Sequence, residues 1–493
     1  MRAATLAALT GLLLMGTACS PEQADEPGTS PNGENARFEP IDEELRESVR
    51  TLVDDHGVEP LDEPPSQDSA LVELGHQLFF DPILSGPQDV NCATCHQMDR
   101  ATADEFSLSA GTGFTIDEHG DRRPGPQASF TTRTSTDLFN RGHQDWHTFQ
   151  WDGRLQQLED DDGQPKFVIH ERSYPKMPGN YVRTIEGADN LLAAQAHMPV
   201  HSRDEMRGYH EFPTIHGDNN TLGGISDHYF DGTWRHIINR LRDVPAYVDL
   251  FQDAYPELDP EDLTYTQAAN ALAAFMIDAF SFTDSPFNRF LKGDDEALTN
   301  DQLRGAELFY GDAGCASCHG GTLMTDQQFY NIAAPPMTSG PEPLNNMDLG
   351  AAHRSHVGSD KSFHFRTPPL HNVADTGPYL HTGAYATLDE VIRHKIDPID
   401  SLWNYDRSHL PPSIRIQVHT RADELQRVED HLSPEALDTP ELSDEDIDHL
   451  VAFMEALSSP QVQALDQWDL DEVPSGLPIP DLTSPSPIID YDN

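Results

Sequence analysis

Two copies of the pattern C-x-x-C-H constrain this chain more than any other feature. They run from Cys92 to His96 and from Cys315 to His319, and they use four of the five cysteines in 493 residues. Two thiols at this spacing can form a redox disulfide, supply half of a zinc site, or be alkylated by the vinyl groups of haem. Only haem attachment also requires the histidine, which ligates the iron. The composition would give roughly 0.002 such patterns by chance, so we predict two c-type haems. The predicted attachment and iron-ligating residues are Cys92, Cys95, His96, Cys315, Cys318 and His319.

The N-terminus has the composition of an export signal. Residues 1–18 contain one Arg, an apolar run too short to span a membrane, and then small residues. Cleavage before Cys19 satisfies the small-x-small rule and also resembles lipoprotein processing, so a lipid on Cys19 is the one membrane contact we expect. Bacteria attach haem to C-x-x-C-H outside the cytoplasm. The protein is therefore expected on the periplasmic side of a bacterial envelope.

The net charge is −53, from 31 basic and 84 acidic side chains. Such a surface repels nucleic acid and anionic lipid, and no nucleic-acid partner is expected. The charge either favours a cationic partner or reflects adaptation to high salt, and the sequence leaves both open.

A short internal repeat indicates two similar halves. The pattern G-x-x-L-F begins at Gly75 before the first haem motif and at Gly305 before the second. Each half is therefore predicted to hold a short helix that leads into a haem-binding turn. The expected parts are a signal peptide (1–18), a lipid-anchor tether and linker (19–68), an N-terminal haem domain (69–285), a C-terminal haem domain (286–465) and a loose tail (466–493).

Helical periodicity dominates the rest of the chain. Apolar stripes at 3.6-residue spacing predict helices around residues 234–241 and 272–280. Another helix is expected to begin after Ser443, which is a typical N-cap. No run alternates convincingly as a strand, and residues 113–129, 161–190 and 208–232 are interpreted as loops. An all-α fold is predicted.

Longer segments resemble the bacterial di-haem cytochrome c peroxidases and the related di-haem enzymes that mature the tryptophylquinone cofactor of methylamine dehydrogenase. The similarity extends from about residue 71 to 457. It rests on "ELGHQLFFDPILSGPQDVNCATCH", "FQWDGR", "LLAAQAHMPVHSRDEM", "SPFNRFLKGD", "LRGAELFYGDAGCASCHGG" and "FRTPPLHNVADTGPYLHTGAYATLDEVI". The resemblance implies an all-α fold of two cytochrome c-like domains, one haem in each, with peroxide as the oxidant.

The resemblance also implies roles for individual residues. The haem on His96 would react with peroxide, and the haem on His319 would pass electrons. Glu205 takes the position of the distal glutamate, which moves a proton between the peroxide oxygens, and Gln195 that of the distal glutamine. Trp151 takes the position of the tryptophan between the haems.

Three positions depart from the family pattern. Pro126 stands where many members carry a distal histidine, and His119 is out of register, so we expect an iron open to peroxide without reductive activation. The usual sixth ligand of the second haem, Met or Tyr, lies fourteen residues after His381. That position is Lys395. The neighbouring His394 is the better ligand chemically, because an amine must first lose its proton, near a pKa of about 10.4, and both stay open. The weaker candidates are Met324, Met337 and Met347.

The third departure concerns a calcium site between the domains. The resemblance places two carbonyl ligands at Thr376 and Pro378, but Thr134 stands where the family has an asparagine side chain. Backbone oxygens suit calcium whatever the side chain, so a calcium ion is left as an open possibility.

The resemblance thus implies an exported di-haem peroxidase that reduces hydrogen peroxide with electrons from a small cytochrome c or cupredoxin. A peroxide-dependent protein-modifying oxidase would share every haem feature. A non-catalytic di-haem electron carrier would need neither Glu205 nor an open iron. One scaffold can serve different oxidations, so the alternatives stay open.

Overall fold

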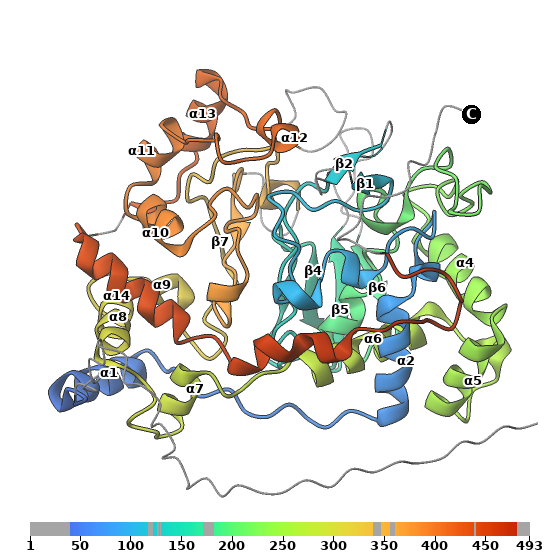
Figure 1. The fold of residues 1–493 in the computed structure, drawn as a ribbon, viewed down its shortest axis with the longest axis horizontal. Helices are drawn as coiled ribbons and strands as arrows, with labels where there is room; N and C mark the ends of the chain where they lie inside the picture. The colour runs from blue at the N-terminus through green and yellow to red at the C-terminus, as the bar shows by residue number, and fades with distance from the viewer. Residues whose placement is uncertain are drawn as a thin grey trace, which may run out of the picture. The chain divides into compact units, whose positions relative to one another are not determined.

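The computed structural model describes residues 40–116, 122–125, 128, 130–170, 182–338, 347–354, 360–437 and 440–480 (Figure 1). The predicted signal peptide, Cys19, His119 and Pro126 lie outside these residues, so the predictions that rest on them stay predictions. The helices are α1 (Glu43–Asp55), α2 (Ser69–Phe80), α3 (Leu191–Gln195), α4 (Phe230–Arg242), α5 (Pro245–Ala254), α6 (Tyr265–Phe280), α7 (Pro286–Leu291), α8 (Asn300–Tyr310), α9 (Ala316–His319), α10 (Leu388–Ile396), α11 (Pro398–Trp403), α12 (Pro412–Arg415), α13 (Ala422–Glu429) and α14 (Asp444–Glu455). The strands are β1 (Phe114–Ile116), β2 (Arg122–Pro124), β3 (Thr148–Phe149), β4 (Leu155–Glu159), β5 (Pro165–His170), β6 (Val182–Ile185), β7 (Phe329–Tyr330) and β8 (Phe365–Arg366).

The internal repeat corresponds to two equivalent helix crossings. Helix α2 packs on α6, and α8 packs on α14 (Figure 1). A Cβ atom at Gly75 would lie 1.9 Å from the carbonyl oxygen of Ala271, and a Cβ atom at Gly305 would lie 1.9 Å from that of His449. The repeated glycine therefore lets two helix backbones touch in each half. The predicted helix before each haem motif is confirmed.

The helices predicted from apolar stripes are also confirmed as α4 and α6. Helix α14 begins at the predicted cap, where the Ser443 hydroxyl accepts a hydrogen bond from the Asp446 backbone N–H and the Asp446 carboxylate accepts from the Ser443 N–H. This capping box satisfies backbone donors that a helix start otherwise leaves unpaired.

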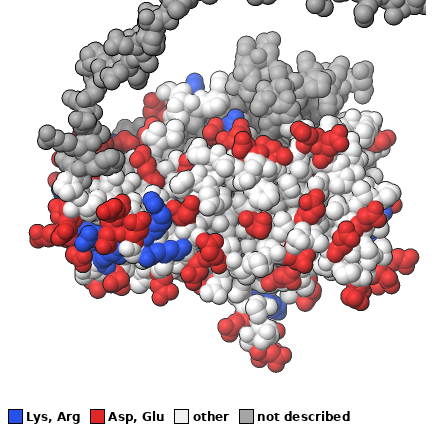
Figure 2. Space-filling view, turned by 60° about the horizontal axis from the view of Figure 1, so that its bottom comes forward, with Lys and Arg blue, Asp and Glu red and all other residues white. Residues whose placement is uncertain are grey.

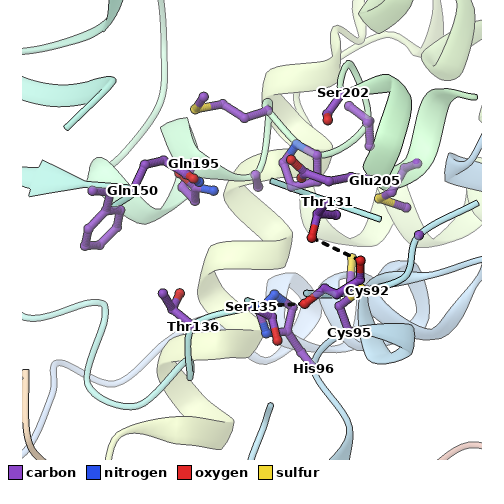
Figure 3. A pocket seen from close by; sticks show the side chains of 18 of the residues that line it. Cys92, Cys95, His96, Thr131, Ser135, Thr136, Gln150, Gln195, Ser202 and Glu205 are labelled. Atoms are coloured by element: carbon purple, nitrogen blue, oxygen red, sulfur yellow. Dashed lines mark hydrogen bonds between the residues drawn. The ribbon is translucent and has the colours of Figure 1, made fainter. Parts of the chain in front are cut away.

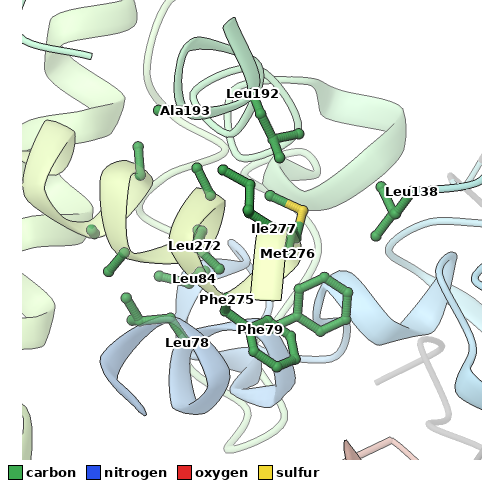
Figure 4. Close-up of a cluster of buried hydrophobic side chains, with 14 of the residues drawn as sticks. Leu78, Phe79, Leu84, Leu138, Leu192, Ala193, Leu272, Phe275, Met276 and Ile277 are labelled. Atoms are coloured by element: carbon green, nitrogen blue, oxygen red, sulfur yellow. The ribbon is translucent and has the colours of Figure 1, made fainter. Parts of the chain in front are cut away.

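Apolar side chains gather in two main clusters. The larger one surrounds α2 and α6 and includes Leu78, Phe79, Leu272 and Phe275 (Figure 4). The other lies among α1, α7, α8 and α14. The described residues from 41 to 480 nevertheless form one compact unit. The domain boundaries drawn from the sequence stay a prediction.

The all-α prediction is wrong in one respect, because the mostly helical fold contains small sheets. Strands β3, β4, β5 and β6 form an antiparallel sheet in that order. Four consecutive residues of β5, Phe167 to His170, are buried, so this strand has no alternating pattern. The loop interpretation of residues 161–190 therefore missed β5 and β6, and that of 113–129 missed the β1–β2 hairpin.

Two segments outside the predicted haem domains also pack against the rest of the protein. Helix α1 lies within the predicted linker, and its buried face of Leu45, Val49 and Val53 packs in the α8 cluster. The prediction of a loose tail is wrong for residues 466–480. The Trp468 carbonyl lies 2.6 Å from Nε2 of His76, and the Ser475 hydroxyl donates to Asp81 at 2.7 Å.

Acidic side chains are spread over the face shown in Figure 2, with few Lys and Arg between them. Within the described part of the chain, none of the helices combines the length and apolar character that crossing a bilayer demands.

Candidate functional site

A cavity of about 550 Å³ lies beside the first C-x-x-C-H motif. Cys92, Cys95 and His96 line one side of it, and Gln195 and Glu205 line the other (Figure 3). The predicted distal residues are separated from the motif by 99 residues or more of sequence, yet they share one cavity with it.

The first motif is held in place by backbone hydrogen bonds. Nδ1 of His96 donates to the carbonyl oxygen of Thr102 at 3.0 Å, which orients the ring and leaves Nε2 as the nitrogen for a metal. Burial lowers the pKa of His96, so the ring is neutral at pH 7, as iron ligation requires. Burial also raises the pKa of the Cys92 thiol to about 12.

The second motif repeats this arrangement. Nδ1 of His319 donates to the carbonyl oxygen of Met324 at 3.2 Å, and burial lowers the pKa of the ring. Burial raises the pKa of Cys315 to about 11. Cys92 packs against the α2–α6 cluster and Cys315 against the α8 cluster, so the two thiol pairs belong to different cores.

Glu205 lies in the π-helical turn Arg203–Arg207. The backbone N–H of Thr112 donates to its carbonyl oxygen at 3.0 Å, and Gly111 has no room for a side chain, because a Cβ there would lie 2.4 Å from that same oxygen. Burial raises the pKa of Glu205, although Arg154 and a hydrogen bond with Ser202 act in the opposite direction. Glu205 is thus a carboxyl whose proton affinity suits proton transfer.

Gln195 ends helix α3, whose first turn is capped by the Asn190 side chain. Its Oε1 atom is buried and has no hydrogen-bond partner among the described residues. A buried polar atom that faces a cavity without a partner indicates a ligand there. The dithiol, the oriented imidazole and this amide fit a c-type haem with a small polar molecule bound above it.

Residues 69–296 match the family model for di-haem cytochrome c peroxidase, and this range contains the first motif, Gln195 and Glu205. This match confirms the resemblance drawn from the motifs. The matched family implies two c-type haems and supports an oxidoreductase.

The chain is similar in sequence to proteins that are named for different functions. The chain is 29% identical over 326 residues to the methylamine utilization protein MauG of Methylorubrum extorquens, covering 66% of this chain and 68% of that one. It is 29% identical over 322 residues to cytochrome c551 peroxidase of Pseudomonas aeruginosa, covering 65% and 70%. Similarity to these relatives therefore does not identify the substrate that this chain oxidises.

Solved structures support the fold. The crystal structure of a MauG-like protein associated with microbial copper homeostasis gives a TM-score of 0.53 at 22% identity, covering 89% of this chain and 99% of that one. A variant of the diheme peroxidase BthA from Burkholderia thailandensis gives a TM-score of 0.51 at 21% identity, covering 82% and 90%.

Trp151 lines the same cavity and is buried. Its indole N–H donates to the Thr134 carbonyl oxygen at 3.3 Å, and its ring lies edge-on to His381 at 6.3 Å between centroids. The nearby Trp146 ring contacts the guanidinium groups of Arg141 and Arg366 at 4.9 and 5.3 Å. Cations over a ring oppose the loss of an electron from it, so this geometry favours Trp151 over Trp146 as a relay, and the relay itself stays a prediction.

The structure distinguishes the two candidate sixth ligands of the second haem. Both ring nitrogens of His394 lie near polar atoms, with Nε2 2.9 Å from the Ile332 carbonyl oxygen and Nδ1 3.0 Å from the Tyr385 hydroxyl. The Lys395 ammonium contacts the Ala436 carbonyl oxygen at 3.3 Å and interacts electrostatically with Cys315, Cys318 and His319. This geometry favours Lys395, which stays a prediction.

The calcium prediction is not tested. The Thr134 hydroxyl donates to the Phe106 carbonyl oxygen at 2.9 Å, and the Thr376 hydroxyl to that of Val373 at 3.3 Å. Pro378 follows a cis peptide bond. Thr134, which stands at the asparagine position, thus already makes a protein contact.

The sequence reasoning missed a set of charged residues on the cavity wall. Arg133, Arg154, Arg354 and Arg366 line the cavity together with the first motif. The "WDGR" segment contained one of them, but no local signal connects it to residues about 200 positions later in the chain.

Proposed function

We propose that this chain is an exported di-haem c-type peroxidase that reduces hydrogen peroxide with electrons from a small exported cytochrome c or cupredoxin. The observation that carries the proposal is the position of Glu205 and Gln195 across one cavity from His96. An electron carrier has no use for a buried acid and amide at its haem. Export is proposed from residues 1–18 and lipid attachment from Cys19, as the sequence suggests.

The distal residues have separate tasks. When bound at Cys92, Cys95 and His96, haem would supply the iron at which peroxide is reduced. The Glu205 carboxylate takes the proton from one peroxide oxygen and returns it to the other, so that water can leave. The Gln195 side-chain N–H donates to the oxygen that leaves, while its Oε1 accepts from a peroxide hydrogen. Trp151 would shorten the electron path from the second haem.

The test is turnover of the holoprotein with hydrogen peroxide and a reduced c-type cytochrome, followed by loss of the donor's absorbance. Donor oxidation that depends on peroxide supports the peroxidase. Haem bands that respond to peroxide while the donor stays reduced would overturn it.

A protein-modifying oxidase is the second candidate. It is favoured by Lys395 at a position where the family has Met or Tyr, and by the 29% identity to a MauG protein. Such an enzyme would react slowly with peroxide and leave a soluble cytochrome untouched, so the same turnover measurement separates the two functions.

The sixth ligand gives a direct prediction. Replacing Lys395 by Ala is expected to convert one of the two haems completely from six-coordinate low-spin to five-coordinate high-spin, because the side chain that fills the axial position is gone. Absorption and electron paramagnetic resonance spectra of the oxidised protein measure this. His394→Gln is the matched control and should leave the low-spin signal in place; the reverse pattern would assign the ligand to His394.

A further inference from the structure

Five charged side chains form a network beside the cavity, which Arg133, Arg154 and Arg354 line. Four of the five are buried, and the Arg154 side chain is 29% exposed. Arg133, Asp152 and Arg154 come from the first half of the chain, and Asp348 and Arg354 come from the second half. Asp152 is 1% exposed, Asp348 6%, Arg354 7% and Arg133 8%. The network therefore connects the two halves inside the protein rather than at its surface.

Asp152 is the centre of this network. Its carboxylate accepts from Arg354 at 2.6 Å and from Arg154 at 2.9 Å, and it lies 3.0 Å from a guanidinium nitrogen of Arg133. Arg133 also donates two hydrogen bonds to Asp348, at 2.7 and 3.0 Å. These paired, charge-assisted contacts fix the positions of the guanidinium planes.

The charges of the network do not cancel. Burial would raise the pKa of Asp152, but the three guanidinium groups outweigh it and hold the pKa well below its usual value. Arg133 likewise lowers the pKa of Asp348 to about 2 against the effect of burial. Two carboxylates are thus ionised beside three guanidinium groups, which leaves one positive charge in excess.

A second cation adds to this excess. Arg366 is 2% exposed, and its guanidinium donates to two neutral acceptors, the carbonyl oxygens of Gln150 and Thr367. It lines the same cavity as Arg133, Arg154 and Arg354. Asp137 and Asp326 act on Arg366 electrostatically, and Glu205 acts on Arg154 in the same way, but the hydrogen bonds of Arg366 go to neutral oxygens. A buried guanidinium that is not bonded to a carboxylate suits an anionic group in the cavity. Haem carries two carboxylates that would suit this position.

We propose that this network holds the carboxylates of the haem attached at Cys92 and Cys95, and that Asp348 and Arg354 let the second half of the chain set the reduction potential of that haem. The inference rests on the haem-binding part of the proposed function and is independent of the substrate. Asp348 does not line the haem cavity, so it acts through Arg133 as a positioning and charge-balancing residue.

The sign of each effect follows from electrostatics. Reduction of the iron adds one negative charge, so a nearby cation favours the reduced form and raises the potential, while a nearby anion lowers it. Removing the charge of Arg354 should therefore lower the potential, and removing the charge of Asp348 should raise it. A substitution that only let water reach the haem would shift the reduction potential of both variants in the same direction.

The experiment is spectroelectrochemical titration of the intact holoprotein carrying Arg354→Met, Arg354→Lys or Asp348→Asn. We expect a shift to lower potential in Arg354→Met, a shift to higher potential in Asp348→Asn, and a value near wild type in Arg354→Lys, which keeps the charge. Arg421→Met is the control, because Arg421 and its partner Asp423 are 62% and 66% exposed and the pair should not affect the titration. His319→Ala alters the transition of the second haem and so identifies the first.

Shifts of the same sign in Arg354→Met and Asp348→Asn, or no shift in either, would overturn the inference while the peroxidase could stand. Asp348→Asn preserves the side-chain shape. If Arg354→Met does not fold, the sign of the potential shift in Asp348→Asn therefore tests the inference. Mass spectrometry of the Cys92–Cys95 peptide tests the premise that the two proposals share, because a peptide without haem would overturn both.

Discussion

Replacing Glu205 by Gln is expected to slow the reaction with hydrogen peroxide by about 10²- to 10⁴-fold, the usual contribution of a positioned acid–base group. Glutamine has nearly the same size and can still donate a hydrogen bond, but it cannot take a proton from one peroxide oxygen and give it to the other. Stopped-flow absorbance of the oxidised holoprotein mixed with peroxide measures the rate directly, without any electron donor.

The pH dependence of this rate provides a second signature. The base form of Glu205 is the active one, so the rate should fall as the pH is lowered through its pKa. Because burial raises that pKa, the fall should occur at higher pH than for an ordinary carboxyl group. The acid limb should be absent in Glu205→Gln.

Glu211→Gln is the matched control, since this exposed carboxylate lies in the same stretch of the chain and outside the cavity. It should leave both the rate and its pH profile unchanged. A fully haem-loaded Glu205→Gln protein that reacts with peroxide at the wild-type rate would contradict the assignment of the acid–base group.

Alanine at Gly75 or Gly305 is expected to cost more stability than ordinary overpacking, above about 3 kcal/mol for each. The added Cβ atom would meet a carbonyl oxygen at 1.9 Å in both cases, and a backbone atom cannot move aside as a flexible side chain can. Each change should force apart one of the two helix crossings, α2–α6 or α8–α14. Urea unfolding followed by circular dichroism should show a lower midpoint for either variant.

Gly224→Ala is the control, because it replaces a glycine by alanine without bringing the new Cβ atom against a backbone atom at close range. A Cβ at that position would meet its nearest neighbours at 3.4 Å, which is ordinary contact, so the midpoint should stay close to that of the wild type. If Gly75→Ala and Gly305→Ala unfold at the same urea concentration as this control, the close helix crossings do not stabilise the fold.

Local patterns predicted much of the architecture, because their physical cause is local. The C-x-x-C-H motif needs only five consecutive residues to define its chemistry, and the cap at Ser443 needs four. The sheet escaped prediction because β5 is buried at consecutive positions. Helix α1 has apolar residues at helical spacing, Leu45, Val49 and Val53, but its segment was assigned to the linker.

The sequence by itself determined the two C-x-x-C-H motifs and the paired helices that precede them, and its resemblance to a family predicted Gln195 and Glu205 as the distal residues. Only the tertiary structure decided that Arg354 lines the cavity beside the first motif, that Asp348 binds Arg133 there, and that the ring nitrogens of His394 face the Ile332 carbonyl oxygen and the Tyr385 hydroxyl. The reason is physical. A motif is specified by neighbours along the chain, whereas charge balance and hydrogen-bond partners depend on residues that folding brings together from distant segments.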